Sequence, residues 1–420
     1  MLLYIFYIII SPVLYLLLNI FRLFSYKINE HWINEKKLLI HVKEKITSAK
    51  NKKIILLHAA SAGEFEQIKP ILKKINKNKF FIVQSFTSPT IYKKEKNNPL
   101  FDISCYHSYD FLWSSYLFFK TIKPYKYIIT RHDVWPTHML ICKLLNIESY
   151  YINANIHKNS IWSYRFLQSF SRKIFSQFKI IFVPSNQINN LFINILGSSS
   201  SIIIVGDSRF DQILDRKKDN NYSLLPMKYK KMNNIIFGSY DAFDEDLIFN
   251  SLIKVFYNGD KDLKKRKAGI ILVPHEVKVQ TINSLIKKLK NKMITAIKLS
   301  DNSHDNANVI IVDRVGILAD LYKYARLAYV GSGFTTGVHS VIEPAVYGCT
   351  VGHGPNIELL DEAKDMFNNN ISHLLKSQND LTEFIDLIDK PKKLFNEDIV
   401  KKYISNSSGA TIRILKEIGL

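Results

Sequence analysis

The sequence has few cysteines. Cys105, Cys142 and Cys349 lie far apart in a chain of 420 residues and form no CxxC pair or other metal-ligand spacing. This scarcity argues against a disulfide framework or a zinc site and favours a reducing compartment. Internal repeats with periods of about 20 to 50 residues are also lacking. With 47% hydrophobic and 23% charged residues, the chain is typical of a globular protein and is long enough for two domains.

Acidic residues are outnumbered by basic ones. There are 37 Asp and Glu against 58 Lys and Arg, which gives a formal net charge of +21. Such an excess favours an anionic partner, which can be a nucleic acid, a membrane surface or a phosphorylated substrate. Drift in base composition explains the excess equally well, because the sequence is also rich in Ile, Asn and Tyr. Lysines are spread along predicted helices in all regions, whereas a nucleic-acid binder needs a basic face with aromatic stacking positions.

Only one long apolar run occurs, MLLYIFYIIISPVLYLLLNIF at the N-terminus. Its length suffices to cross a hydrocarbon core of about 30 Å. A secretory signal peptide would need a basic start and an A-x-A-like cleavage site, which are missing. Pro12 and the tyrosines leave open a helix that lies in the membrane interface. We expect residues 1–22 to be a membrane anchor of either kind, with Arg22 and Lys27 keeping the body of the protein in the cytoplasm.

Short apolar runs alternate with longer amphipathic stretches from residue 53 onward, which predicts strands and helices in alternation. The runs are near-continuous rather than alternating, as in buried parallel strands. A polar stretch over residues 213–234 is interpreted as a linker. We therefore predict an α/β protein with two Rossmann-like domains, 23–212 and 235–420, and a ligand cleft between them. The predicted strands cover residues 53–58, 80–85, 125–130, 149–153, 179–184, 234–239, 269–274, 308–313, 327–333 and 350–355.

The motif HAASAGE follows the first predicted strand. Ser61 and Gly63 lie in the turn, and Glu64 opens the next helix. A carboxylate in this place faces the predicted cleft and can act as a general base. It can equally well complement the positive end of the helix dipole. Glu66, rotated away on the same helix, is expected to be a surface carboxylate.

Two further motifs of the first half carry charged side chains. TRHDVWP follows a strand and puts Arg131 and Asp133 near Glu64 if the strand order is the usual one. In GDSRFD, just before the linker, Arg209 can neutralise an acid of a ligand or pair with Asp211.

The densest group of candidate residues is AYVGSGFTTGVHSVIEPAVYG in the second half. Gly331, Gly333 and Gly337 allow a ligand to approach the backbone closely. A helix is predicted to begin near His339 or Ser340, so that free N–H groups there can hold a phosphate. By itself, a set of glycines after a strand is a weak nucleotide signal.

Three other side chains are expected at the same cleft. Glu343, one turn into the predicted helix, can accept hydrogen bonds from a ribose diol. His275 and Glu276 end another strand in the motif VPHE.

The acidic stretch YDAFDED looks like a metal site, but its place at a helix start favours N-capping by Asp241.

Together these motifs resemble the Kdo transferases of lipopolysaccharide synthesis, which move 3-deoxy-D-manno-octulosonic acid (Kdo) from CMP-Kdo to lipid A precursors. The resemblance begins with the apolar N-terminus and SAGEFEQ, continues through GDSRFD and PHE, and ends with LADLYKYARLAYVGSGFTTGVHSVIEPAVYG and GP. The motifs occur in the family's order and at its intervals over nearly the whole chain. The PHE and GEFEQ forms are similar to a Bacteroidetes-like branch.

This resemblance implies a GT-B fold, in which the second domain binds the donor and the first binds the acceptor. It also implies that Glu64 is the catalytic base. The residues expected to bind CMP-Kdo are His275, Glu276, Gly331, Ser332, Gly333, His339, Ser340 and Glu343. The candidates to meet the acceptor or the Kdo carboxylate are Ser61, Gly63, Arg131, Asp133 and Arg209.

Four places depart from the family's pattern. After GS, Tyr240, Asp241 and Ala242 stand where the family shows other residues, so no role is carried over there. Asp133 replaces a glutamate and is one methylene shorter. Ser340 replaces an asparagine but can still cap a helix. His353 stands where an apolar or aromatic residue is usual.

The prediction is an inverting, metal-independent glycosyltransferase without a cofactor. Its donor is CMP-Kdo, its acceptor is a lipid A precursor, and it works at the cytoplasmic face of the inner membrane with no nucleic-acid partner. Two alternatives stay open. One is a membrane-bound GT-B transferase for another nucleotide sugar, and the other is a non-catalytic membrane- or anion-binding protein.

Overall fold

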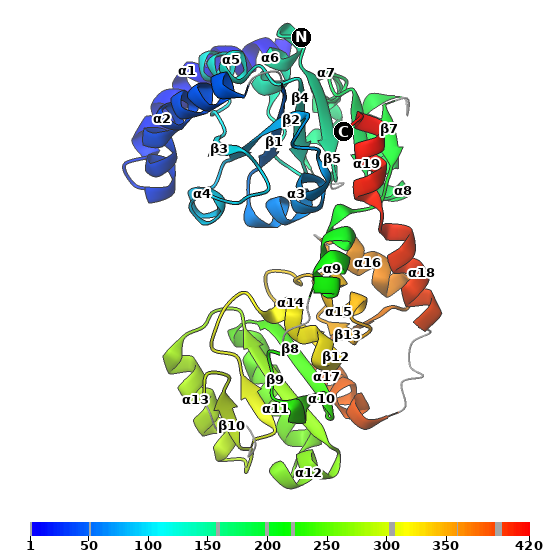
Figure 1. Cartoon of the computed structure of the whole chain (residues 1–420). Coiled ribbons are helices and arrows are strands. Elements are labelled where there is room, and N and C mark those ends of the chain that lie inside the picture. The colour runs from blue at the N-terminus through cyan, green and yellow to red at the C-terminus, as the bar shows by residue number, and fades with distance from the viewer. Residues whose placement is uncertain are drawn as a thin grey trace. The chain divides into compact units, whose positions relative to one another are not determined.

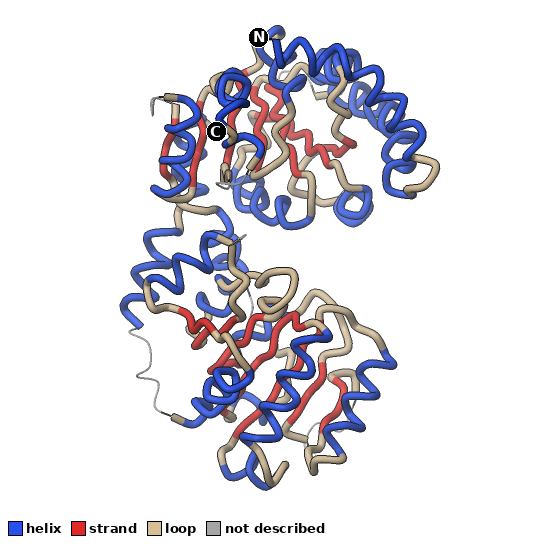
Figure 2. Tube along the Cα trace, turned by 180° about the vertical axis from the view of Figure 1, so that it is seen from behind, coloured by secondary structure: helices blue, strands red, loops and turns tan. Residues whose placement is uncertain are grey.

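Strands and helices alternate along the chain and form two parallel sheets, as the computed structural model in Figure 1 and Figure 2 shows. The structure describes residues 2–49, 52–156, 160–197, 201–219, 223–301, 307–358, 360–390 and 397–420. The chain divides into two units. The first consists of Met1–Gln212 with Asn406–Leu420, and the second of Ile213–Ser405.

The sheet of the first unit has the strand order β3-β2-β1-β4-β5-β6-β7, with all pairs parallel. The chain order reverses between β1 and β4, which is where α/β sheets bind ligands at the carboxyl ends of their strands. The turns after these two strands are therefore the candidate site. The strands are β1 (Lys53–Ala59), β2 (Phe80–Phe86), β3 (Ile103–Tyr106), β4 (Lys126–Thr130), β5 (Glu148–Ile152), β6 (Ile180–Val183) and β7 (Ile202–Ile204).

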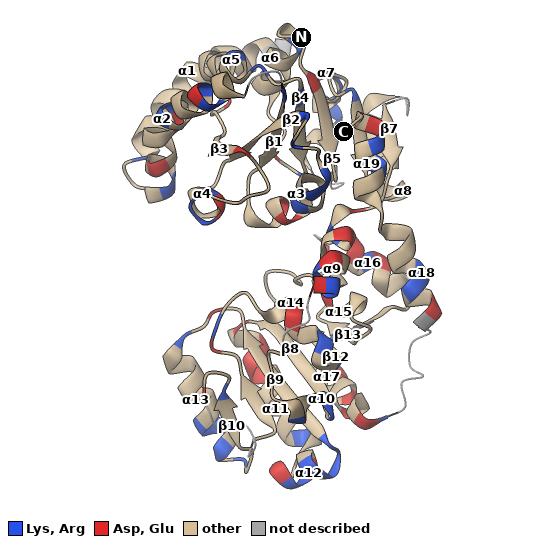
Figure 3. Cartoon of the chain, in the orientation of Figure 1, with Lys and Arg blue, Asp and Glu red and all other residues tan. Residues whose placement is uncertain are grey.

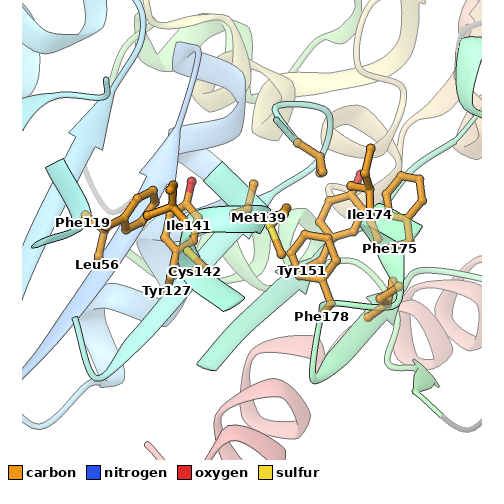
Figure 4. Packing of buried hydrophobic residues seen from close by; sticks show 14 of the residues in the cluster. Leu56, Phe119, Tyr127, Met139, Ile141, Cys142, Tyr151, Ile174, Phe175 and Phe178 are labelled. Carbon is orange, nitrogen blue, oxygen red and sulfur yellow. The ribbon is translucent and has the colours of Figure 1, made fainter. Parts of the chain in front are cut away.

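Helices cover both faces of this sheet, because the apolar side chains of each strand point alternately to the two sides. Leu56 of β1 packs in the cluster of Figure 4 with Phe119, whereas Ile55 and Leu57 pack with Phe65 in a second cluster. The helices of this unit are α1 (Leu2–Phe21), α2 (Tyr26–Ser48), α3 (Ala62–Lys74), α4 (Pro89–Glu95), α5 (Leu112–Ile122), α6 (Pro136–Leu144), α7 (Gln168–Phe175), α8 (Asn186–Leu196) and α19 (Ala410–Ile418).

The second unit repeats this plan with the strand order β10-β11-β9-β8-β12-β13-β14. Its strands are β8 (Asn233–Tyr240), β9 (Ala268–Pro274), β10 (Ala296–Lys298), β11 (Val309–Ile311), β12 (Ala325–Val330), β13 (Thr350–His353) and β14 (Ser372–Leu374). Its helices are α10 (Met227–Lys230), α11 (Ala242–Val255), α12 (Asp260–Lys265), α13 (Val279–Lys290), α14 (Leu318–Leu321), α15 (Ile342–Val346), α16 (Asp361–Asn368) and α17 (Gln378–Asp386). Two further helices, α9 (Ser208–Asp219) and α18 (Glu397–Ser407), cross the unit boundary.

The C-terminal boundary differs from the prediction, which placed residues 235–420 in one domain. Residues Asn406–Leu420 belong to the first unit. The reason is that Ile414 and Ile418 of α19 are buried in the same cluster as Phe65 of α3. The predicted linker, 213–234, is also partly regular, because α9 continues to Asp219; residues 220–222 lie outside the described part of the chain.

The first helix packs along the body of the first unit by one face. Tyr7 donates a hydrogen bond to the Asp110 carboxylate at 2.6 Å, and Ser11 is buried. The Tyr15 ring lies 4.9 Å from Trp32 and 5.3 Å from Trp113. In the described part of the chain no single helix meets the length and hydropathy expected of a membrane span, although the bent pair formed by α1 and α2, at 117°, does so together.

Candidate functional site

The turn after β1 places Glu64 in the first turn of α3. Ser61 caps the helix, because its hydroxyl accepts from the Glu64 amide at 3.4 Å, and the Glu64 carboxylate in turn accepts from the amides of Ala60 at 2.6 Å and Ser61 at 3.2 Å. This reciprocal arrangement is a capping box. A methyl group at Gly63 would meet no atom within 4 Å, so packing does not require glycine there.

Burial makes the Glu64 carboxylate a stronger base than a surface glutamate. Desolvation by burial and then the charge of Asp133 raise the pKa of Glu64, and the attraction of His58 with the Ala60 and Ser61 amides only partly offsets them. The side chain is 6% exposed. Glu64 thus caps the helix. Its raised pKa is compatible with the role of a base, which stays a prediction. Glu66 contacts Lys69 and Gln212 instead.

The turn after β4 brings a second carboxylate, Asp133, close to Glu64. Its Oδ2 accepts from His58 Nε2 at 2.6 Å and from the Thr87 hydroxyl at 3.0 Å, and its Oδ1 accepts from Trp135 Nε1 at 2.7 Å. Burial alone would raise the pKa of Asp133, but the hydrogen bond and attraction of His58, followed by the other two donors, hold the pKa below its usual value. Asp133 is therefore ionised where Glu64 titrates.

Arg131 has a backbone φ of 61°, in the left-handed region that a non-glycine residue rarely adopts. Its amide donates to the Ile152 carbonyl at 3.2 Å, and its positive charge helps to lower the pKa of Asp207. Strained backbone of this kind is concentrated at functional sites. Arg131 thus lies in the same turn as Asp133, as the sequence predicts.

Arg209 contacts Asp207, whereas Asp211 was one of its two predicted partners. Its guanidinium grips the Asp207 carboxylate with Nε at 2.8 Å and a terminal nitrogen at 2.6 Å. Asp211 instead accepts from the amides of Gly409 and Thr411 at the start of α19. The unpaired N–H groups and positive dipole of that helix start account for the difference.

The second unit has a pocket of about 330 Å³ at the carboxyl ends of β8 and β9. It contains four of the predicted donor-site residues: His275, Glu276, Ser332 and His339. The remaining lining residues are Tyr240, Asp241, Ala242, Glu245, Pro274, Lys278, Thr281 and Thr336.

Two imidazoles stack at this pocket. The rings of His275 and His339 are 4.8 Å apart at an angle of 11°, and Nδ1 of His275 lies 2.9 Å from the Ser239 hydroxyl. Burial, followed by His275, lowers the pKa of His339, and the proximity of Asp241 only partly opposes this. The stacked pair presents a flat surface with hydrogen-bonding edges, which suits the base or sugar of a nucleotide.

Gly331 and Gly333 are required where they stand. A Cβ at Gly331 would lie 2.5 Å from the Ser239 carbonyl oxygen, and one at Gly333 would lie 2.7 Å from the Gly354 amide. The amides predicted to hold a phosphate are partly occupied, however. The Gly331 amide donates to the Gly238 carbonyl at 2.9 Å, and the Ser332 amide donates to the Asp244 carboxylate at 2.6 Å.

The predicted helix near His339 or Ser340 begins later. The helix α15 starts at Ile342 and has only five residues, because the Ser332 carbonyl ties back Thr335 and Gly337 and keeps the preceding segment in turns. Glu343 lies in α15, Ser340 precedes that helix, and neither residue lines the pocket. Their contacts with a nucleotide stay predictions.

The stretch YDAFDED forms a helix cap, as the sequence predicts. Asp241 accepts from the amides of Phe243 and Asp244 at the start of α11, and Asp244 closes the capping box. No group of three or more potential metal ligands occurs among the described residues.

Asp244 also holds the glycine segment in place, which gives a first prediction. Asp244→Ala leaves the Ser332 amide and the Tyr329 hydroxyl, which donates at 2.6 Å, without their buried acceptor. We expect a loss of about 3 kcal/mol in the free energy of unfolding, measured by urea denaturation. Asp246→Ala, an exposed neighbour on the same helix, is the matched control and should cost about 0.5 kcal/mol or less. An equal loss in both variants would contradict this role.

Sequence reasoning did not foresee how four polar residues build these sites. His58 and Thr87 orient Asp133, whereas Asp244 and Thr335 brace the glycine segment. Two of them left a signal: His58 and Thr87 are polar residues at the carboxyl ends of predicted buried strands, where side chains reach the ligand edge of a parallel sheet.

Comparison with known proteins shows which family the sequence resembles. Residues 36–212 match the family model described as 3-deoxy-D-manno-octulosonic-acid transferase (kdotransferase). A 3-deoxy-D-manno-octulosonic acid transferase from Rickettsia felis is 24% identical over 371 residues, which cover 84% of this chain and 76% of the relative. The enzyme of the same name from Haemophilus influenzae is 23% identical, with 70% and 68% covered.

Solved structures share the fold. A UDP-N-acetylglucosamine 2-epimerase from Listeria monocytogenes, described as putative, superimposes with a TM-score of 0.60 at 12% identity, over 87% of this chain and 96% of that one. A glycosyltransferase from Rickettsia africae gives a TM-score of 0.51 at 11% identity, over 86% and 94%. These likenesses confirm the predicted GT-B class of two Rossmann-like domains. The match over residues 36–212 and the named relatives make the chain similar to the 3-deoxy-D-manno-octulosonic acid transferases, which are glycosyltransferases.

Proposed function

We propose that this protein transfers Kdo from CMP-Kdo to a lipid A precursor. The observation that carries the proposal is the buried Glu64 carboxylate, with its raised pKa, beside the ionised Asp133 in a chain similar to the Kdo transferases. A base of this kind is what transfer to a hydroxyl acceptor needs.

In the proposed reaction, an acceptor hydroxyl attacks the anomeric carbon of Kdo while Glu64 takes its proton. The bond between that carbon and the phosphate oxygen breaks on the opposite side, and CMP leaves with the electron pair, so the configuration inverts. The second unit supplies the donor pocket. There the His275 and His339 rings pack against the nucleotide, and the Thr336 hydroxyl is a donor for its polar groups.

Arg131 and Arg209 are the proposed counter-charges for the Kdo carboxylate or an acceptor phosphate. Arg131 lies in the turn that carries Asp133, and Arg209 lies beside Asp207 near the start of α9. Planar guanidinium groups pair well with carboxylates and phosphates. Ser61 and Gly63 in the turn before Glu64 would line the approach of the acceptor.

The test of the whole proposal is mass spectrometry of the lipid product after the purified full chain is incubated with CMP-Kdo and a lipid A precursor. We expect the acceptor to gain the mass of one or more Kdo residues. Transfer only from another nucleotide sugar would support the alternative GT-B transferase. The absence of any transfer, with binding to anionic lipid retained, would support a non-catalytic membrane protein.

We further propose that transfer needs no divalent metal ion. The pocket offers imidazole and hydroxyl groups, together with Lys278, which contacts Glu276, as partners for the phosphate. EDTA in excess should therefore leave kcat within about twofold, the scatter expected without a Lewis acid in the mechanism. The matched control is EDTA saturated with Ca²⁺. A loss of activity that Mg²⁺ restores would contradict the proposed mechanism.

We also propose that the protein works at the cytoplasmic face of the inner membrane, with α1 lying in the interface. Tyr7, Ser11 and Tyr15 tie one side of α1 to the body of the first unit. The opposite side exposes Phe6 and Ile9, with others at helical spacing. Figure 3 shows α1 without charged residues, which suits contact with lipid tails.

A further inference from the structure

Buried polar side chains form a connected network behind Asp133 in the first unit. Asp133 accepts from Nε2 of His58, whose Nδ1 lies 3.1 Å from the Ser85 hydroxyl. The same hydroxyl lies 3.0 Å from Nδ1 of His107. Nε2 of His107 lies 2.8 Å from the Tyr127 hydroxyl. The network thus crosses the sheet from β1 through β2 to the end of β3 and β4.

The stability of the fold does not account for this network. His58 and Ser85 are wholly buried, and His107 is 2% exposed. Polar groups buried in this way stabilise a protein little or not at all relative to apolar side chains of similar volume. They do, however, restrict side chains to one arrangement when every member has a partner. The network is therefore suited to orienting the Asp133 carboxylate, its outermost member.

The direction of the bond between His58 and Asp133 follows from proton accounting. An ionised carboxylate only accepts, so Nε2 of His58 carries the hydrogen that lies between them. Burial, followed by the neighbouring histidines, lowers the pKa of His107 well below its usual value, so this ring is neutral. The His58 ring is stacked on it at 3.9 Å and linked to it through Ser85. The His58 ring is therefore held with its N–H pointing at Asp133.

We propose that His58 is a positioning residue of the transfer reaction, which holds Asp133 as an oriented anion beside Glu64 so that Glu64 is the carboxylate that takes the proton. This inference rests on the proposed function of Glu64. Two carboxylates in one poorly solvated place titrate apart, and their surroundings decide which one stays ionised. Here three groups donate hydrogen bonds to the Asp133 carboxylate and keep it ionised. The bond from His58 is the shortest of the three.

The groups that shift the pKa values of the two carboxylates are consistent with Asp133 as the anion and Glu64 as the base. Asp133 meets His58, Thr87 and Trp135. Glu64 meets the amides of Ala60 and Ser61, the negative charge of Asp133 and the attraction of His58. Because Asp133 raises the pKa of Glu64, removal of its charge should lower the pKa of Glu64 and weaken it as a base.

The kinetic test compares the pH dependence of kcat/KM in His58→Leu, His58→Gln and Asp133→Asn with that of the native chain. His58→Leu removes the donor and should lower kcat/KM by about 10²-fold, the scale expected when a reacting group is misplaced. His58→Gln keeps a donor at the same distance along the side chain and should recover most of this loss. Asp133→Asn should move the acidic limb to lower pH by about one unit.

A second measurement needs no substrate, so it separates this inference from the proposed function. In the native chain, NMR should show a downfield N–H proton on Nε2 of His58, and Asp133→Asn should move it upfield. His353→Gln, at a buried histidine of the second unit that bonds the Ser372 hydroxyl, is the matched control and should leave the His58 resonance in place.

Two results would overturn the positioning role. One is an acidic limb that does not move in Asp133→Asn, and the other is an equal loss in His58→Gln and His58→Leu. If His58→Leu does not fold, the acidic limb of the pH profile of Asp133→Asn and the NMR resonance of His58 still test the positioning role. Absence of transfer by the native chain, with the downfield resonance present, would instead remove the proposed function and leave the geometry standing.

Discussion

Glu64→Gln is expected to lower kcat for Kdo transfer by about 10³-fold, within the usual contribution of a general base. The amide cannot take a proton from the acceptor hydroxyl. Binding of CMP should be unchanged, because the donor pocket is built from residues of the second unit. Isothermal titration with CMP and a single-turnover assay with CMP-Kdo measure the two effects separately.

Glu64→Gln removes the base without disturbing the start of α3, because glutamine can keep the helix cap. Its side-chain oxygen can accept from the Ala60 and Ser61 amides as the Glu64 carboxylate does. The matched control is Glu66→Gln, two residues further along α3, where the carboxylate contacts Lys69 and Gln212. It should leave kcat within about twofold, as expected for a surface charge outside the reaction. Full turnover in Glu64→Gln would rule out the general-base role.

The pH dependence of the rate is an independent test of the general-base role of Glu64. A general base must be deprotonated, so the native rate should fall as the pH drops through the pKa of Glu64. Because burial and Asp133 raise that pKa, the fall should occur at a higher pH than an ordinary glutamate would give. The residual rate of Glu64→Gln should not show this limb.

The central strands of both sheets could be predicted from sequence, and the edge strands could not. All ten predicted runs form strands, from β1 at Lys53 to β13 at His353. The four that were missed, β3, β7, β10 and β14, are the outer strands of the two sheets and have three or four residues each. A short strand with one neighbour buries too few apolar side chains to leave a continuous run in the sequence.

The site residues divide in a similar way. Position after a strand made Glu64, Asp133 and His275 candidates, because parallel strands bring their carboxyl ends to one edge. The partners of these residues come from strands far away in sequence: Thr87, for example, reaches Asp133 across 46 positions. The late start of α15 also depends on backbone bonds to Ser332 that no local pattern announces.

Removal of the exposed apolar stripe of α1 should strongly weaken membrane binding. Phe6, Ile9 and Leu16 are 61%, 68% and 64% exposed and lie on one side of the helix. Burial of such a side chain in lipid is worth about 1.5 to 3 kcal/mol. The triple variant Phe6→Ser, Ile9→Ser, Leu16→Ser therefore loses about 5 kcal/mol, which is a factor of about 10³ to 10⁴ in partition. Co-sedimentation with vesicles that contain anionic lipid measures it.

The matched control changes equally exposed apolar residues of the second unit to serine: Tyr257, Met293 and Val315. It should bind vesicles as the native chain does, since these residues are not on α1. The binding that remains in the α1 variant should fall as salt is added, because it would rest on basic residues alone. Equal sedimentation of the α1 variant and the native chain would contradict an anchor at this face.

The depth of the first unit in the bilayer distinguishes an α1 that lies in the interface from an α1 that spans the membrane. A helix that crosses the bilayer would have to leave its contacts with the body, including the Tyr7 bond to Asp110 and the packing of Tyr15 on Trp113. If α1 lies in the interface, these contacts persist and Trp113, which is partly exposed beside it, stays at the level of the lipid headgroups. Quenching of Trp113 by brominated lipids should then be strong for bromines near the headgroups and weak for those at the ends of the acyl chains.

Tyr7→Phe should also reduce the stability of the first unit by about 1 kcal/mol even in the membrane-bound state. If α1 were detached from Asp110, the same substitution would leave the stability unchanged.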